Sequence, residues 1–245
     1  MPETVSCSRP FADVLADFQT APLSLCWQVP GIWPVNKPSG PSSNRAVLLA
    51  RKALGIKKVG HAGTLDPLAD GLLLLLAGNA TRLFDKMQEF TKSYVAGFRL
   101  GEKTDSQDIT GSPVSDWMPQ NRPPLSRQTV EDALTAFQGA ILQIPPMHSA
   151  LKKDGQPLYK LARRGETIDR AARPVTVFDL RLNEFDGIDG TLSMTVSKGF
   201  YVRTLIDDLG LALGTGAVMT RLTRTGIGPF ILANAVAMEN LTQKK

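Results

Sequence analysis

The clearest candidate for chemistry in this chain is an aspartate in a segment marked by glycines. Asp66 lies between Gly60 and Gly71, in the sequence GHAGTLDPLADG. Pro67 restricts Asp66 to extended or turn conformations, so its carboxylate would project from a defined backbone. Glycines allow such a loop to approach a ligand closely. From these residues alone, Asp66 could present its carboxylate to a ligand or only close a turn with its side chain.

Metal or disulfide chemistry is not indicated. The chain has two cysteines, Cys7 and Cys26, and two histidines, His61 and His148. The cysteines lack the spacing of a metal-ligand pair, and two histidines make a multi-histidine centre improbable. We therefore expect no metal site and no cofactor, and the cysteine usage fits a reducing cytoplasm.

Basic residues are concentrated in two stretches. The formal charge is +5, but residues 1–30 hold one basic and three acidic residues, so the rest of the chain carries +7. No acidic residue occurs from Phe18 to Leu65, where six lysines and arginines lie, and His148–Arg173 has a balance of +4. The two stretches favour a polyanion-binding face. Two solvated surfaces are the simpler alternative on charge alone.

Composition points to a globular chain. Hydrophobic residues make up 42% and charged residues 21% of the 245 residues, which excludes collagen-like and wholly disordered chains. The longest apolar run, Leu72–Ala77, is far shorter than the roughly 20 residues of a membrane span. The first residues lack the basic start and apolar stretch of a secretory signal. We expect a cytoplasmic protein without membrane contact.

The elements that must position Asp66 form a mixed α+β pattern. We predict helices over 43–54, 129–138 and 201–213, with Ser42 or Ser43 and then Thr129 as caps and Gly55 and Gly214 as ends. Strands are predicted over 72–76, 94–100, 175–182 and 191–197. Residues 101–125 are expected to form a loop. Because helices and strands alternate without regular βαβ spacing, the pattern favours an α+β domain over a doubly wound one.

Six segments in order resemble the TruB family of tRNA pseudouridine synthases. The segment around Asp66 closely resembles the family's G-H-x-G-x-L-D-P-x-A-x-G signature. The other five are Asn36–Ser43, Lys92–Tyr94 with Arg99–Gly101 and Thr104–Asp105, Pro145–Lys152, Ser197–Leu205, and Leu222–Thr225 with Gly228–Phe230. Six ordered motifs over residues 31–235 are far more specific than one pattern. The resemblance implies the pseudouridine synthase fold, with a central mixed, mostly antiparallel sheet flanked by helices and an RNA-binding thumb insertion.

This resemblance implies a reaction. In uridine, the bond between N1 and C1′ breaks, the uracil turns, and C5 joins C1′ without redox change. The family's aspartate corresponds to Asp66, and attack at C1′, attack at C6 and elimination to a glycal all stay open. Arg203 would pair with Asp66 and Tyr94 would stack on the flipped uracil. Without the resemblance, a surface arginine and a half-buried strand tyrosine are the simpler interpretations.

The resemblance also implies how RNA is held. His61 would wedge into the RNA loop, although a lone histidine is more often a structural hydrogen-bonding residue. Lys37 would support the catalytic loop or contact phosphate, and Leu222 would pack against the target base. The thumb, residues 141–173, would bind RNA through Lys152, Lys153, Arg163 and Arg164, or be no more than a surface helix. The expected substrate is the T arm of tRNA, with uridine 55 as target.

Three positions depart from the family pattern. Asn36 stands where many relatives have aspartate, His148 where tyrosine or phenylalanine is usual, and Thr223 where arginine is common. None removes the nucleophile, so recognition of the RNA loop is what these changes would alter.

The expected organisation is an extension over 1–30, one catalytic domain over 31–235 and a tail over 236–245. The C-terminal RNA-binding domain of many bacterial relatives is expected to be absent. We expect a monomer with no obligate protein partner. Two other classes remain: a tRNA-binding folding module, which has no need of a carboxylate at Asp66, and a small-molecule enzyme, which the basic stretches disfavour.

Overall fold

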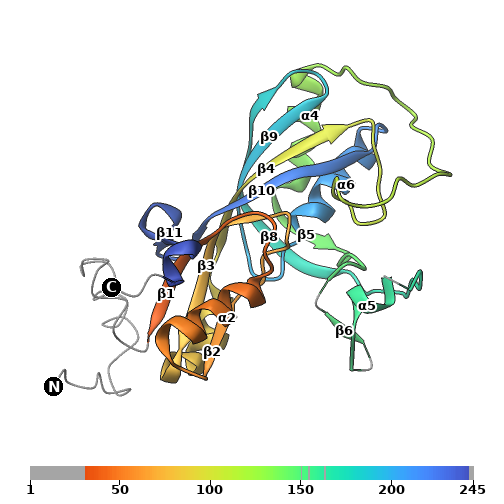
Figure 1. The fold of residues 1–245 in the computed structure, drawn as a ribbon. Coiled ribbons are helices and arrows are strands. Elements are labelled where there is room, and N and C mark those ends of the chain that lie inside the picture. Colours follow the sequence, from red (N-terminus) through yellow and green to blue (C-terminus); the bar gives the residue numbers. More distant parts are fainter. Residues whose placement is uncertain (1–30, 150, 154, 163, 243–245) are drawn as a thin grey trace. The chain divides into compact units, whose positions relative to one another are not determined.

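A computed structural model describes residues 31–149, 151–153, 155–162 and 164–242 (Figure 1). The chain divides into two compact units. Unit 1 comprises the described residues up to Phe90 and those from Arg224 onward, and unit 2 comprises Thr91–Thr223. The predicted extension, residues 1–30, lies outside the described residues.

Unit 1 is built on a small mixed sheet. Its strands are β1 (Ile32–Lys37), β2 (Val59–Ala62), β3 (Asp70–Ala77), β11 (Phe230–Ile231), β12 (Val236–Ala237) and, from Arg224 on, the end of β10 (Ala217–Ile227). β3 is antiparallel to both β1 and β2, and β1 is parallel to β12. The run of five leucines in β3 is buried. This run is continuous rather than alternating because both faces of the strand are covered.

Two helices and three 3₁₀ turns complete unit 1. The helices are α2 (Ser43–Leu54) and α3 (Phe84–Glu89), and the turns are η2 (Gly78–Leu83), η4 (Leu232–Asn234) and η5 (Met238–Thr242). The predicted limits of α2 are confirmed: the Ser42 side chain accepts from the Arg45 N–H, and Gly55 is left-handed at φ +66°. Met238 and Leu241 are buried, so the predicted tail begins with a segment that packs within unit 1.

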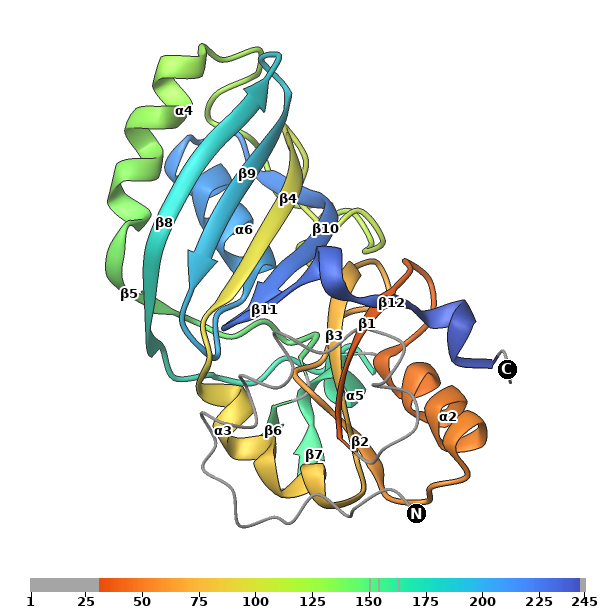
Figure 2. The same cartoon turned by 90° about the vertical axis from the view of Figure 1, so that its left-hand side faces the viewer.

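Unit 2 contains a longer antiparallel sheet. Its strands are β4 (Lys92–Leu100), β5 (Gly139–Gln143), β8 (Arg173–Phe185), β9 (Asp189–Val196) and the first part of β10, and its helices are α4 (Arg127–Leu134), α5 (Leu158–Ala162) and α6 (Val202–Ala212). The order is β10-β4-β9-β8-β5. β9 is antiparallel to β4 and to β8, and β8 is antiparallel to β5. Figure 2 shows these strands side by side, with α4 along β8 and α6 behind β4.

The two faces of this sheet differ in polarity. On one face, Ala96, Leu192 and Met194 are buried where α4 and α6 pack. On the other face, Ser93 pairs with Thr195 at 3.1 Å and Arg99 with Asp189 at 2.8 Å. The alternation follows from the period of two in a strand. The unit 2 sheet thus has helices packed on one face and polar side chains on the other, as antiparallel sheets allow.

The region predicted as a thumb forms a small substructure of its own. It holds the hairpin of β6 (Lys152–Lys153) and β7 (Gln156–Pro157), followed by α5. Met147, Leu158 and Leu161 form a separate hydrophobic cluster, with Leu151, Ala162 and Ile168 packed against it. The segment therefore has its own small hydrophobic core, which stabilises the backbone that carries its surface side chains.

The predicted fold class and most predicted elements are confirmed. The four predicted strands lie within β3, β4, β8 and β9, apart from Ser197, which follows β9. Residues 101–125 carry no helix or strand beyond isolated bridges. The cap at Thr129 was wrong, because α4 begins at Arg127 and the Ser126 hydroxyl accepts from the Thr129 N–H at 3.1 Å. Gly60 and His61, predicted to lie in the loop with Asp66, belong to β2.

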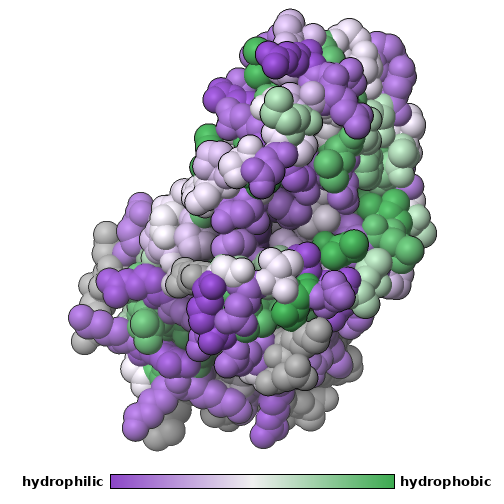
Figure 3. Space-filling model, turned by 90° about the vertical axis from the view of Figure 1, so that its right-hand side faces the viewer, coloured by the Kyte–Doolittle hydropathy of each residue, from purple (hydrophilic) through white to green (hydrophobic). Residues whose placement is uncertain are grey.

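The surface is mixed in character. Figure 3 shows hydrophilic residues over much of the face it draws, with hydrophobic residues gathered in separate groups between them. Leu142 and Phe178 in unit 2 are 69% and 59% exposed. Within the part of the chain that the structure describes, no helix is long and apolar enough to span a membrane.

Gly210 near the end of α6 should tolerate no side chain. A Cβ there would overlap the backbone of Gly216 and Ala217 and lie 2.7 Å from the Ala217 Cβ. Overpacking of this kind costs about 1–3 kcal/mol. We expect Gly210→Ala to lower the melting temperature in calorimetry, whereas Leu211→Ala, at a 52% exposed neighbour, should change it little. Equal melting temperatures for Gly210→Ala and the wild type would contradict this packing.

Candidate active site

The loop that carries Asp66 is held by hydrogen bonds to segments distant in sequence. The Ser43 hydroxyl at the start of α2 accepts from the Leu65 N–H at 2.9 Å and donates to the Leu65 carbonyl at 3.0 Å. The Gly40 N–H donates to the Pro67 carbonyl at 2.7 Å, and the Ser39 hydroxyl donates to the Leu68 carbonyl at 2.9 Å. The residues on both sides of Asp66 are therefore fixed by the first residue of α2 and by the segment that precedes it.

Within the loop, the Ala69 N–H donates to the Asp66 carbonyl at 3.1 Å. This bond closes a turn through Pro67, whose fixed φ suits that position. The backbone on both sides of Asp66 is thus fixed, and the projection of its carboxylate toward a ligand stays a prediction.

Lys37 lies at the end of β1 and is fully buried. Its ammonium donates to the carbonyls of Pro38 and Pro41 at 2.7 and 2.9 Å. Burial holds the pKa of Lys37 below its usual value, opposed by the charge of Asp70. A buried ammonium bonded to backbone carbonyls favours support of the turn before α2 over contact with phosphate.

A second buried cation in unit 1 is Arg224, on β10, which is 2% exposed. Its Nε donates to the Leu72 carbonyl at 2.7 Å and its Nη2 to the Gly63 carbonyl at 3.0 Å. Arg224 lies in the Leu222–Thr225 motif, which assigns it no role. A buried charge cannot be identified from residue type alone, because arginine is usually exposed.

His61 lies on β2, paired with Leu75. Its Nδ1 is buried and has no hydrogen-bond partner among the residues that the structure describes. Burial holds the pKa of His61 below its usual 6.5, and the positive charge of Arg224 lowers it by a smaller amount. The imidazole is therefore neutral at pH 7, and its action as a wedge in RNA stays a prediction.

The other predicted catalytic residues belong to unit 2. Tyr94 is half-buried on β4 opposite Met194, and Leu222 is buried on β10. Arg203 lies in the first turn of α6 and is 5% exposed. Because Asp66 lies in unit 1, the predicted pairing of Asp66 with Arg203 stays a prediction.

Arg203 is fixed by acceptors from two loops of unit 2. Its Nη1 donates to the Ser106 carbonyl and its Nη2 to the His148 carbonyl, both at 2.8 Å. Its Nε lies 3.8 Å from an Asp108 carboxylate oxygen. A cation is disfavoured at a helix N-terminus, so these acceptors offset an unfavourable position. His148 acts here through its carbonyl, so the departure at this position leaves the contact intact.

The loop that supplies these acceptors is itself anchored to α6. Gln107 is left-handed at φ +65°. Its amide donates to Asp207 at 3.1 Å and accepts from the Thr204 hydroxyl at 3.2 Å. Lys103 also pairs with Asp207, at 2.7 Å. No pattern in the sequence indicates this network, because its members come from segments about a hundred residues apart.

Of the predicted thumb residues, only Arg164 has a described side chain. It donates to Gln156 at 2.8 Å and lies 3.1 Å from Glu166. The backbone of Lys152 and Lys153 forms β6; their side chains and Arg163 lie outside the described part of the chain.

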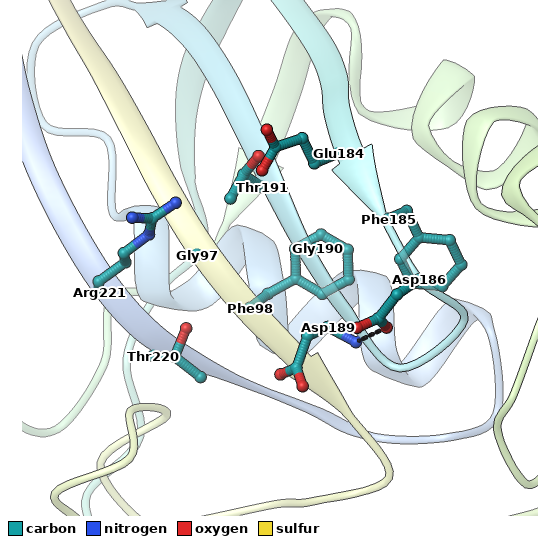
Figure 4. A pocket seen from close by; sticks show the side chains of 10 residues that line it. All are labelled: Gly97, Phe98, Glu184, Phe185, Asp186, Asp189, Gly190, Thr191, Thr220 and Arg221. Carbon is teal, nitrogen blue, oxygen red and sulfur yellow. Dashed lines mark hydrogen bonds between the residues drawn. The ribbon is translucent and has the colours of Figure 1, made fainter.

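A pocket of about 390 Å³ opens on the polar face of the unit 2 sheet (Figure 4). It is lined by Gly97, Phe98, Glu184, Phe185, Asp186, Asp189, Gly190, Thr191, Thr220 and Arg221. Tyr94 is three residues from Gly97 on the same strand, so its side chain points to the opposite face. None of the predicted site residues lines this pocket, so the candidate active site lies elsewhere.

Comparisons with known proteins show which family the chain belongs to. Residues 51–202 match the model of the family described as "TruB family pseudouridylate synthase (N terminal domain)", and residues 203–245 match "tRNA pseudouridylate synthase B C-terminal domain". The chain is 44% identical over 241 residues to "tRNA pseudouridine synthase B" of Burkholderia lata, covering 98% of this chain and 73% of that protein. It is 46% identical over 213 residues to the protein of that name from Pseudomonas paraeruginosa, covering 87% and 69%.

Among solved structures, the chain is similar to one described as "Crystal Structure of a Cbf5-Nop10-Gar1 Complex". The TM-score is 0.68 with 29% identity, over 92% of this chain. The match spans 57% of that longer chain. Fold and matches define the class, a pseudouridine synthase and hence an isomerase. Within that class, the chain belongs to the TruB family.

Asp208 on α6, the helix that carries Arg203, should make stability depend on pH. Burial, and next the charge of Asp207, raise the pKa of Asp208 from 3.8 to about 6. Between these values the folded chain binds more protons than the unfolded chain, so stability falls as pH rises. Asparagine has nearly the shape of a protonated aspartate and carries no charge. We therefore expect Asp208→Asn to raise the free energy of unfolding at pH 7 by about 1–3 kcal/mol.

The difference between Asp208→Asn and the wild type should shrink as the pH is lowered to 4, as measured by urea unfolding. Asp116→Asn, in the exposed loop, is the matched control and should show no such trend. A difference that stays constant from pH 4 to pH 7 would argue against the raised pKa.

Proposed function

We propose that this chain isomerises uridine to pseudouridine in tRNA, with uridine 55 of the T arm as target. The proposal rests on the Asp66 loop, whose backbone is fixed by hydrogen bonds, in a chain that belongs to the TruB family. The relatives named above are tRNA pseudouridine synthases, and the basic stretches fit an RNA substrate.

In the proposed mechanism, Asp66 is the catalytic carboxylate. Bonds around Leu65, Pro67 and Leu68 fix its backbone before the substrate arrives, and such preorganisation lowers the barrier for a bound substrate. The N1–C1′ bond breaks, the uracil turns, C5 joins C1′, C5 loses its proton and N1 gains one. The three routes named for Asp66 stay open.

Arg203 and Tyr94 are proposed to act on the flipped nucleotide. Arg203 has its guanidinium held by two carbonyls, so it would meet the Asp66 carboxylate in a fixed orientation, with little entropy lost on pairing. Tyr94 would stack on the uracil, which offsets part of the few kcal/mol that unstacking the base costs. Leu222 would pack against the same base.

The reaction and its nucleophile can be tested together. We expect the wild type to form pseudouridine at uridine 55 of an unmodified tRNA transcript, mapped by carbodiimide adducts and primer extension. Asp66→Asn should bind the transcript and leave it unmodified, because an amide is neither ionised nor nucleophilic. Asp116→Asn, with the same change at an exposed position, should behave like the wild type.

Modification by Asp66→Asn would refute the role of Asp66. Modification at another uridine would refute the target, and binding by the wild type without modification would favour the folding-module alternative.

The thumb is proposed to bind the phosphate backbone. Replacing Lys152, Lys153, Arg163 and Arg164 by glutamine should weaken tRNA binding and make it less sensitive to salt. Each phosphate contact contributes roughly 0.7–0.9 to the slope of log K against log salt. Filter binding at several salt concentrations measures both effects.

The control for the thumb variant is Arg127→Gln with Arg181→Gln, two exposed arginines of unit 2. An affinity and salt slope that match the wild type in the thumb variant would contradict a thumb contact with phosphate.

A further inference from the structure

The guanidinium of Arg224 bridges the two ends of the loop that carries Asp66. Before Asp66 it donates to the Gly63 carbonyl at 3.0 Å and approaches the Thr64 carbonyl at 3.5 Å. After Asp66 it donates to the Leu72 carbonyl at 2.7 Å. One side chain thus contacts the loop on both sides of the proposed nucleophile.

Burial makes this contact selective for one loop conformation. Arg224 is 2% exposed, and a buried cation that loses a partner is strongly destabilising. Its acceptors here are backbone carbonyls, which point inward only when the peptides at Gly63 and Thr64 have this orientation. A conformation in which these two peptides turn away would leave Nη1 and Nη2 without the Thr64 and Gly63 carbonyls, with only the bond from Nε to the Leu72 carbonyl remaining.

Two glycines of the loop fit against the same residue. Gly71 has φ +97°, and a Cβ on it would overlap the Arg224 carbonyl oxygen and lie 2.9 Å from its nitrogen. Gly63 has φ +91°, and a Cβ on it would lie 3.4 Å from Nη1 of Arg224. Gly71 therefore lets the backbone of β10 approach closely, and Gly63 supplies a left-handed turn in contact with the Arg224 guanidinium.

From these contacts we infer that Arg224 is a positioning residue for the reaction, which sets the conformation of the Asp66 loop without touching the substrate. The inference rests on the proposed function, since it assumes that Asp66 is the nucleophile. It is distinct from the predicted role of Arg203, which would pair with the carboxylate itself.

The test compares Arg224→Lys and Arg224→Ala with Arg221→Ala, an exposed arginine on the same strand. A lysine keeps the charge, but its single nitrogen lacks the planar fork that reaches Leu72 and Gly63 together. We expect the single-turnover rate of pseudouridine formation to fall about 100-fold in both Arg224 variants, as for a small misplacement of a catalytic group. The Kd for the transcript should be unchanged, and Arg221→Ala should keep the wild-type rate.

Two further measurements separate positioning from loss of structure. Amide hydrogen exchange of peptides covering residues 63–72, without RNA, should be faster in Arg224→Lys while peptides of α2 exchange as in the wild type. Millimolar guanidinium should restore part of the rate of Arg224→Ala, by refilling the cavity, and none of the rate of Asp66→Asn.

A wild-type rate in folded Arg224→Lys, or unchanged exchange over residues 63–72, would overturn the inference. If Arg224→Ala does not fold, the single-turnover rate of Arg224→Lys and its amide exchange over residues 63–72 are sufficient to test the inference. A wild-type chain that makes no pseudouridine would instead overturn the proposed function, and the exchange measurement would still test the loop contact.

Discussion

Buried cations that are satisfied by backbone carbonyls constrain the loops of unit 1. Lys37 and Arg224 are both hidden from water, and between them they hold carbonyls before α2, before Asp66 and at the start of β3. A charge without acceptors in such a place is strongly unfavourable. The backbone carbonyls must therefore point toward these two side chains. This requirement restricts the conformation of the loop that contains Asp66.

Unit 2 uses the same device for Arg203. The carbonyls of Ser106 and His148 accept from its guanidinium, and Gln107 ties the first of these loops back to Asp207 on α6. The left-handed Gln107 costs conformational energy, and the bonds of its amide to α6 offset that cost. In both units, a buried cation orders loops by bonding to their backbone carbonyls, in addition to the apolar side chains, such as Leu65 and Met147, that these loops bury.

Local signals in the sequence predicted most elements and missed the contacts between them. Ser42 and Gly55 define α2 through caps that involve only neighbouring residues. At α4 the predicted cap, Thr129, was wrong, because the Ser126 hydroxyl accepts from the Thr129 N–H. The glycines around Asp66 and the proline after it identified Asp66 as a candidate for chemistry. Arg224 did not, because its partners lie about 160 residues away and nothing in the motif distinguishes a buried arginine from an exposed one.

Anchoring through carbonyls also bears on the three positions that depart from the family pattern. At His148 the group that holds Arg203 is the backbone carbonyl, which every residue type supplies. Asn36 is exposed on β1, and Thr223 precedes Arg224 without taking part in its bonds. Substitution at these positions thus leaves the loop acceptors in place, because the conformations depend on the cations and the glycines. On the proposed function, the side chains at 36, 148 and 223 would act on recognition of the RNA, while the conformation of the Asp66 loop would stay the same.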